Sequence, residues 1–265
     1  MDYTDYTFRA EYMSFKHHIT EKPPCDAFSM HTHNMYELLY FISGDATHII
    51  EDRKYKLKKG DLILIRPSKY HFIQIDSSVT YERYDILFDE KALGITEASR
   101  VSRGIEVVNL TSNAIADALL KKSDYYCANL PPSEFVQVMT LILRELFINL
   151  SIKREYVPSD HSLVSPLLSK ALKYINDNIF TVTSVSEVAS ALFVTESYLY
   201  RLFKTELKNS PKKYIADKRL LYAQKLILGG KKPTEVYEDC GFNDYTSFYR
   251  GYLKFFGHTP SKDHK

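Results

Sequence analysis

The spacing of the hydrophobic residues changes once along the chain, from short alternating runs to helical periodicity. Up to about residue 90, runs of β-branched and aromatic residues alternate with turn signals such as Ser43-Gly44-Asp45 and Glu51-Asp52-Arg53, a pattern typical of short antiparallel strands. Strands this short and this regularly spaced predict a sandwich or a barrel. The predicted strands are Tyr36–Ile42, Thr47–Glu51, Lys54–Leu57, Asp61–Arg66, His71–Ile75 and Tyr81–Phe88.

From about residue 110 onward the apolar residues follow i, i+3, i+4 spacing, which predicts amphipathic helices. The first two helices are Asn113–Cys127 and Glu134–Ser151. Their apolar faces either pack on the preceding sheet or pair with a second chain, and the strongly apolar second helix favours a dimer interface. The charged segment Lys153–Ser162 carries a proline and is predicted to be a linker.

After this linker the chain is predicted to be entirely helical. Ser165-Pro166 is typical of a helix start, and Ser184 with Glu187 forms a capping box. Glycines end three of the helices, at Gly229-Gly230, Gly241 and Gly257. The predicted helices are Leu167–Asn178, Val188–Phe193, Glu196–Lys208, Lys212–Leu228, Thr234–Cys240 and Tyr245–Phe256.

Two helix–tight-turn–helix units occur among these helices, Val185–Phe203 and Val236–Phe256. In each unit the second helix has apolar residues on one side and polar or basic residues on the other, as a helix that enters the DNA major groove requires. The linking helix, Pro211–Leu228, is about 27 Å long at ~1.5 Å per residue. Successive major-groove faces lie about 34 Å apart. A linking helix of this length can place two recognition helices in adjacent turns of one duplex.

The composition is that of a soluble globular protein, with 45% apolar and 26% charged residues, which excludes wholesale disorder, collagen and a membrane bundle. The three cysteines, Cys25, Cys127 and Cys240, are far apart. This usage is typical of a reducing compartment and excludes a disulfide framework and a zinc finger. The most apolar stretch, Val138–Leu150, is interrupted by charges and is too short to span a bilayer. We therefore expect a cytoplasmic protein with no membrane partner.

The net charge of +2 is unevenly distributed. From Pro166 onward there are 16 Lys/Arg against 10 Asp/Glu, whereas the first 165 residues hold 19 against 23. This asymmetry indicates that the C-terminal part meets a polyanion, or else that it has a solvated basic surface.

The C-terminal motifs resemble those of a known family. Gly241–Arg250, followed by Lys254–Pro260, resembles the signature of AraC/XylS-type transcriptional regulators. Ser197–Lys204 is similar to that family's first recognition helix, and Pro211–Ile215 to the start of its linking helix. The resemblance extends over residues 166–260 and implies a tandem helix-turn-helix domain that binds double-stranded DNA at specific sequences.

The same resemblance implies which side chains face the DNA. Arginine is the side chain best suited to bidentate contact with guanine, so Arg201 and Arg250 are the main candidates for base readout. The alternative for each is a phosphate contact or a surface ion pair. In the first turn, Phe193 stands where the family often has glycine. The implied DNA-binding residues are Ser197, Tyr200, Arg201 and Lys204 in the first unit and Tyr245, Thr246, Tyr249 and Arg250 in the second, with Lys204 assigned to phosphate.

Four polar residues in the N-terminal half have a spacing that brings them together. His31-x-His33-x3-Glu37-x6-Gly44 is followed by Gly60-x6-Pro67-x3-His71. Two histidines separated by one residue share a strand face, and a nearby carboxylate with a histidine from a later strand can converge on one cation. The pattern resembles the two motifs of the cupin barrel over roughly residues 15–90, although Ile75 stands where the second motif usually has asparagine.

Two interpretations of this cluster are open. Either His31, His33, Glu37 and His71 hold a metal, or they line a polar interior that hydrogen-bonds a small effector. The incomplete second motif favours the latter, so we predict an effector-binding site with no metal and no other cofactor. The family resemblance implies a small-molecule effector, most commonly a sugar.

Together these patterns predict a multi-domain β plus all-α protein that regulates transcription and is not an enzyme. Residues 1–108 are expected to form a cupin-like effector-sensing barrel, residues 109–157 a helical dimerisation segment with the start of the linker, and residues 158–265 the tandem helix-turn-helix domain of a homodimer. Two alternatives remain: a metal-dependent cupin enzyme with an appended helical domain, and a DNA binder whose barrel is only a dimerisation scaffold.

Overall fold

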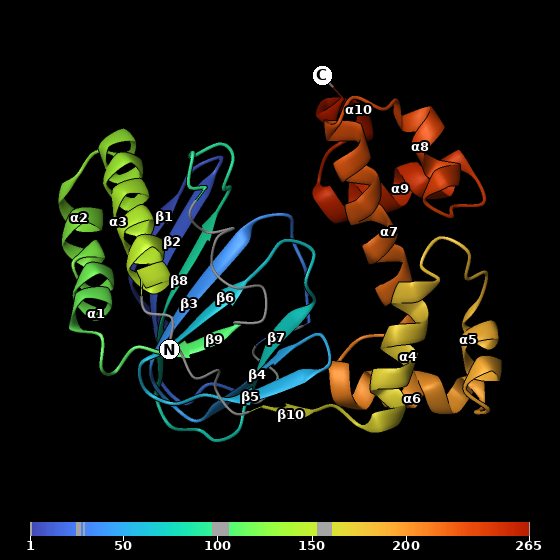
Figure 1. The fold of residues 1–265 in the computed structure, drawn as a ribbon, viewed down its shortest axis with the longest axis horizontal. Coiled ribbons are helices and arrows are strands. Elements are labelled where there is room, and N and C mark those ends of the chain that lie inside the picture. The colour runs from blue at the N-terminus through green and yellow to red at the C-terminus, as the bar shows by residue number, and fades with distance from the viewer. Residues whose placement is uncertain (1, 25–27, 29, 97–105, 153–160, 265) are drawn as a thin grey trace. The chain divides into compact units, whose positions relative to one another are not determined.

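The computed structural model describes residues 2–24, 28, 30–96, 106–152 and 161–264. The chain divides into two compact units, Met1–Ser162 and Leu163–Lys265. The first contains two antiparallel sheets and three helices, and the second consists of helices (Figure 1). The predicted linker, residues 153–162, lies almost entirely outside the described residues.

The strands of the first unit form a six-stranded and a four-stranded sheet. All six predicted strands are confirmed to within one residue at each end, whereas β1, β2, β9 and β10 were not among the predicted strands. Among the described residues the two sheets are separate, so the expected barrel is not closed. The six-stranded sheet has the order β1 (Asp2–Arg9), β2 (Met13–Thr20), β8 (Tyr81–Phe88), β3 (Tyr36–Ser43), β6 (Asp61–Ile65) and β9 (Val107–Asn109). The four-stranded sheet has the order β10 (Ser162–Leu163), β5 (Arg53–Lys56), β4 (Ala46–Ile50) and β7 (His71–Ile75).

The pairing register of β3 with β8 decides which side chains face the space between the sheets. Phe41 is opposite Arg83 and Leu39 is opposite Asp85, so these four side chains share one face. Leu39 and Phe41 belong to a buried cluster that also contains Ile73 of the other sheet. The face that carries Arg83 and Asp85 is therefore the interior between the two sheets.

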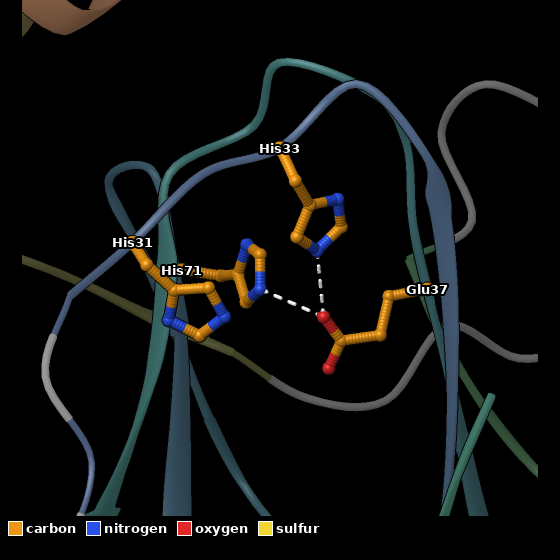
Figure 2. Close-up of side chains that lie close together, drawn as sticks. All are labelled: His31, His33, Glu37 and His71. Atoms are coloured by element: carbon orange, nitrogen blue, oxygen red, sulfur yellow. Dashed lines mark hydrogen bonds and ion pairs between the residues drawn. The ribbon is translucent and has the colours of Figure 1, made fainter. Parts of the chain in front are cut away.

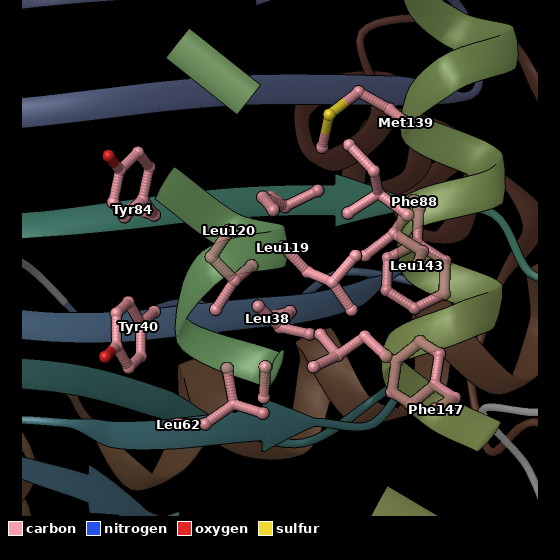
Figure 3. Packing of buried hydrophobic residues seen from close by; sticks show 14 of the residues in the cluster. Leu38, Tyr40, Leu62, Tyr84, Phe88, Leu119, Leu120, Met139, Leu143 and Phe147 are labelled. Atoms are coloured by element: carbon pink, nitrogen blue, oxygen red, sulfur yellow. The ribbon is translucent and has the colours of Figure 1, made fainter. Parts of the chain in front are cut away.

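The opposite face of the six-stranded sheet is covered by α1 (Ala114–Lys121), α2 (Ser123–Asn129) and α3 (Pro132–Ile152) (Figure 1). Figure 3 shows Leu119 and Leu143 of these helices among the side chains of the sheet, in one buried cluster. The helices thus bury their apolar faces on their own sheet. The predicted helix over residues 113–127 is divided into α1 and α2, because the chain turns at Lys122.

Helix α3 is the one described helix that is long and apolar enough to cross a membrane by length and composition. It extends beyond the apolar stretch Val138–Leu150 at both ends, so the helix is longer than that stretch alone indicated. Seven of its side chains, including Phe135, Leu143 and Phe147, are buried, as in the core helix of a globular unit.

The second unit contains the predicted helices and one additional short helix, α10. Ser165, Ser184, Thr195 and Asp244 each accept a hydrogen bond from a backbone N–H in the first turn that follows, which supplies one of the donors that a helix N-terminus leaves unpaired. The helices are α4 (Pro166–Asp177), α5 (Val185–Ala191), α6 (Glu196–Leu207), α7 (Pro211–Leu228), α8 (Pro233–Asp239), α9 (Tyr245–Phe256) and α10 (Pro260–Asp263).

Helix α7 contributes to both helix-turn-helix units. Near its start, the ring of Tyr214 packs edge-on against Phe203 of α6, with 6.0 Å between the ring centroids. Toward its end, Leu220 and Ile227 lie in one cluster with Phe248 of α9. Since α7 buries residues on both sides, this 18-residue helix joins the two helix-turn-helix units within the compact C-terminal unit.

Candidate functional site

The structure brings together the four polar residues that the sequence singled out in the N-terminal unit (Figure 2). His31 and His33 precede β3, Glu37 lies on β3 and His71 begins β7. The backbones of His31 and His71 exchange two hydrogen bonds of 3.0 Å, which fix the segment before β3 against the start of β7. The Nε2 atoms of His33 and His71 both lie 2.9 Å from the same oxygen, Oε2 of Glu37.

The charge state of this centre follows from its hydrogen bonds. Burial acts to raise the pKa of Glu37, but the hydrogen bonds from His33 and His71 hold it well below 4.5. Burial acts to lower the pKa of His71, yet the hydrogen bond to Glu37 and its negative charge raise it above 6.5. The buried carboxylate is therefore ionised and paired with the His71 imidazole.

The same geometry suits a divalent transition-metal ion. One ligand atom from each of His31, His33, Glu37 and His71 lies within 4.8 Å of the other three, and three imidazoles with one carboxylate form a donor set suited to such ions. The Nδ1 atoms of His33 and His71 lie 2.9 Å from the carbonyl oxygens of Met35 and Lys69. Metal-binding histidines usually donate their second ring N–H in this way. The residues fit both a cation and a hydrogen-bonded ligand, and the absence of a metal stays a prediction.

The interior between the sheets holds further polar residues that the sequence analysis did not include in the site. Arg83 is 7% exposed, and its Nε and Nη1 atoms have no hydrogen-bond partner among the described residues. Its guanidinium lies over the rings of Phe28 and Tyr81, at 4.6 and 5.1 Å from their centroids. The nearest carboxylate, that of Asp85, is 3.7 Å from Nη2. A buried guanidinium in this state has donors available for a ligand.

His48 and Asp85 extend this polar interior. Neither ring nitrogen of His48 has a partner among the described residues, and burial, together with the charge of His71, lowers its pKa to about 3. Burial and the charge of Glu37 raise the pKa of Asp85 to about 6. Once the pairing register of the strands is known, the alternation of side chains places these residues in the interior between the sheets. A single sequence does not contain the register, so these residues could not be assigned to the site from the sequence alone.

In the second unit, the residues predicted to contact DNA lie on the outer faces of α6 and α9. Ser197, Arg201, Lys204, Thr246 and Arg250 are exposed, and Tyr200, Tyr245 and Tyr249 are half-buried. Neither Arg201 nor Arg250 forms a salt bridge with another described residue; the Arg201 guanidinium lies over the Tyr198 ring at 4.9 Å. Both arginines therefore have donors available on the surface.

The turn of the first helix-turn-helix unit is built on Phe193. Its backbone is left-handed, with φ of 56°, a conformation that costs a residue with a Cβ roughly 1–2 kcal/mol. Its side chain is 96% exposed. The bulky residue therefore adopts the backbone that glycine would, and its ring points into solvent beside the start of α6. In the second helix-turn-helix unit, Gly241 takes the equivalent place, with φ of 78°.

Two known domain families match the two units. The AraC-like ligand binding domain matches residues 18–124, and the helix-turn-helix domain matches residues 188–265. The Msm operon regulatory protein of Streptococcus mutans is 24% identical over 96% of this chain and 92% of its own length. The transcriptional activator RhaR of Enterobacter sp. (strain 638) is 22% identical over 91% of this chain and 89% of its own length.

Among solved structures, a transcriptional regulator with an AraC-type DNA-binding domain from Chromobacterium violaceum is 30% identical to this chain, with a TM-score of 0.35. It covers 37% of this chain, and the match spans 89% of its own length. The two full-length relatives are named as regulators of transcription or of an operon, and the two domain families are a ligand-binding domain and a helix-turn-helix domain.

Proposed function

Because this chain belongs to the AraC family of transcriptional regulators, we propose that α6 and α9 read two major-groove segments of one operator and that a small molecule bound between the two sheets controls this binding. The observation that carries the DNA-binding role is the equivalent placement of Arg201 and Arg250 on two capped helices joined by α7. We assign base readout to Ser197, Tyr200, Arg201, Tyr245, Thr246, Tyr249 and Arg250 and a phosphate contact to Lys204.

Selection of bound sequences from random duplexes tests this role. The full chain is expected to enrich sites with two conserved blocks about one helical turn apart. Arg201→Ala and Arg250→Ala are each expected to relax base preference in one block and to weaken binding by about 1–3 kcal/mol. Lys204→Ala serves as the matched control, because loss of a phosphate contact weakens all sequences alike. Uniform weakening by both arginine variants contradicts base readout.

We propose that the effector binds to His31, His33, Glu37 and His71 and reaches into the interior beside Arg83. The interior atoms without a hydrogen-bond partner among the described residues include two donors on Arg83, an acceptor on Asp85, and one donor and one acceptor on the neutral ring of His48. A hydroxyl group both donates and accepts, so a polyhydroxylated molecule such as a sugar fits this mixture, whereas an anion would face two carboxylates.

A thermal-shift panel of pentoses, hexoses and disaccharides tests the effector class, with small carboxylic acids as the comparison. Stabilisation by a member of the sugar set, lost in His48→Leu and Arg83→Met, supports the proposal. Stabilisation by carboxylates alone contradicts it. In vivo, Glu37→Gln or His71→Ala is expected to abolish the effector response while DNA binding by the unliganded protein persists.

A second candidate follows from the 4.8 Å convergence of the four ligand atoms. In this alternative His31, His33, Glu37 and His71 hold a divalent cation, which would supply a Lewis-acidic position for an oxygen of the effector. Elemental analysis of protein purified without chelator separates the two: well under one metal per chain supports the hydrogen-bonded site, and a stoichiometric metal supports the cation.

We further propose that the chain acts as a homodimer through its helical segment. The outer side of α3 carries Leu141, Ile148 and Ile152, which are 65, 47 and 73% exposed. A hollow of about 330 Å³ lies between this side and α1, lined by Ile115 and Glu145 among others. Apolar residues on a helix that already buries its other face are typical of a self-association surface. Light scattering of Leu141→Glu is expected to show a monomer.

The proposed division of labour is an effector-sensing domain over residues 1–108, a dimerisation segment over 109–157 and a DNA-binding domain over 158–265. We propose that the chain acts in the cytoplasm and catalyses no reaction, because its relatives are transcriptional regulators. Turnover of a bound ligand by the purified protein would contradict the last point.

A further inference from the structure

The guanidinium of Arg219, in the middle of α7, contacts the backbone of the loop before the first helix-turn-helix unit and of the turn in the second. Nε donates a hydrogen bond of 2.7 Å to the carbonyl oxygen of Ile179, and Nη2 donates one of 2.6 Å to that of Val182. Both acceptors lie in the loop that leads into α5. Nη1 donates a hydrogen bond of 2.6 Å to the carbonyl oxygen of Gly241, in the turn between α8 and α9. One side chain thus connects the loop before the first unit to the turn of the second.

The loop and the turn also touch each other directly at this point. A Cβ atom on Gly241 would lie 2.6 Å from the carbonyl oxygen of Phe180 and 2.8 Å from Cζ of Arg219. Real Cβ contacts are not this short, and the φ of +78° adds a second reason for glycine. Gly241 therefore permits the close approach that the Arg219 hydrogen bonds hold in place.

The chemistry of this contact requires arginine. Three nitrogen atoms of one planar group point to three carbonyl oxygens on two different segments, and the fixed fork of the guanidinium matches that arrangement. An ammonium group is a point charge on a flexible stem and does not span the three acceptors. Arg219 is half-buried, and because three of its nitrogens are engaged by backbone, its role differs from that of the exposed Arg201 and Arg250.

We propose that Arg219 is a positioning residue that sets the separation and relative orientation of α6 and α9, and through them the number of base pairs between the two half-sites of the operator. This inference rests on the proposed DNA recognition by both helices. Two linked binding elements gain affinity only when their geometry allows simultaneous engagement. A contact that fixes this geometry therefore determines spacing specificity without touching a base.

The test compares Arg219→Lys with the wild-type full chain on a duplex selected by the wild type from a random library. Three derived duplexes have one half-site scrambled, or one base pair inserted or deleted between the half-sites. Arg219→Lys is expected to bind the scrambled duplex like the wild type. On the intact duplex it is expected to bind at least about tenfold more weakly, with little discrimination between the three spacings. Gly241→Ala is expected to behave in the same way, and Lys225→Gln, which alters an exposed residue of the same helix, like the wild type.

Several results would overturn the inference. One is a folded Arg219→Lys chain that keeps the wild-type spacing preference. Another is equal weakening on every duplex with a smaller salt dependence, which would make Arg219 a phosphate contact. Loss of helical circular dichroism in Arg219→Lys would assign the residue to folding alone. If the wild type itself enriches no two-block site, the proposed DNA recognition fails instead, and the two failures are thereby distinguished.

Discussion

Replacing Glu37 with alanine is expected to lower the free energy of unfolding of the N-terminal unit by about 3–5 kcal/mol. The side chain is 5% exposed and accepts two hydrogen bonds of 2.9 Å, from His33 and His71. Hydrogen bonds to a charged group contribute about 1.5–3 kcal/mol each, and removal of one partner from a buried ion pair costs about 3–5 kcal/mol. His71, which is 1% exposed, would lose its carboxylate partner at a buried position.

Differential scanning calorimetry of the full chain measures this effect. A loss of this size corresponds to a decrease in melting temperature of about 10 °C for a unit of this length. The transition of the C-terminal unit is expected to stay where it is and serves as the internal reference. Glu21→Ala, at an exposed position, is the matched control and is expected to change stability by less than about 0.5 kcal/mol.

The same calorimetric experiment distinguishes a hydrogen-bonded centre from a metal centre. Without a resident cation, a chelator leaves the wild-type transition unchanged. With a resident cation, the chelator lowers the melting temperature of the wild-type N-terminal unit, since a ligand present at a hundred times its Kd stabilises the folded state by about 2.7 kcal/mol. In that case the chelator has no effect on the melting temperature of Glu37→Ala. A loss of stability below about 1 kcal/mol for Glu37→Ala, with no chelator effect, would contradict a buried, ionised Glu37 that is hydrogen-bonded by His33 and His71.

Three further predictions concern pH, dimerisation and the first turn. Burial acts to lower the pKa of His17, but its hydrogen bonds to Asp124 and Glu82 raise it above 6.5, so its stabilisation is fully present below pH 6.5 and is lost as the pH rises through the folded-state pKa. Urea unfolding of wild type and His17→Gln should therefore differ by about 1–2 kcal/mol near pH 6 and by less at pH 9; a difference that grows with pH contradicts the raised pKa. A fragment of residues 161–265 is expected to bind a duplex with two operator copies at least about tenfold more weakly than the full chain; equal affinity contradicts dimerisation through α1–α3. Phe193→Gly is expected to stabilise the C-terminal unit by up to about 1 kcal/mol, because it removes the left-handed strain; destabilisation measured by thermal unfolding would show that the exposed ring contributes to folding.

The elements of this fold were predictable where one local pattern determined them. Ser184 and Asp244 each begin a helix by accepting a backbone N–H, which depends only on the next few residues. Strand β9, Val107–Asn109, has three residues, too few to establish an alternating pattern. Its existence depends on pairing with β6, which lies more than 40 residues earlier. Such a partner is not visible in a single sequence.

The residues of the candidate sites were likewise predictable only where a local sequence pattern identified them. The His31, His33, Glu37 and His71 set has a recognisable spacing, and the structure brings these residues together. Arg83 lies in a strand that reads as an ordinary alternating segment, and only its pairing opposite Phe41 shows that it faces the interior. The contact of Arg219 with Gly241 joins segments 22 residues apart through backbone carbonyls, for which no residue type provides a signal.

Methylation interference on the selected operator detects recognition of two adjacent major-groove segments, because methylation of guanine N7 blocks contacts in the major groove. We expect two clusters of interfering guanines about 10 base pairs apart, of which Arg201→Ala removes one and Arg250→Ala the other. A single cluster, or two clusters that both arginine variants leave unchanged, would contradict recognition of two adjacent grooves by α6 and α9.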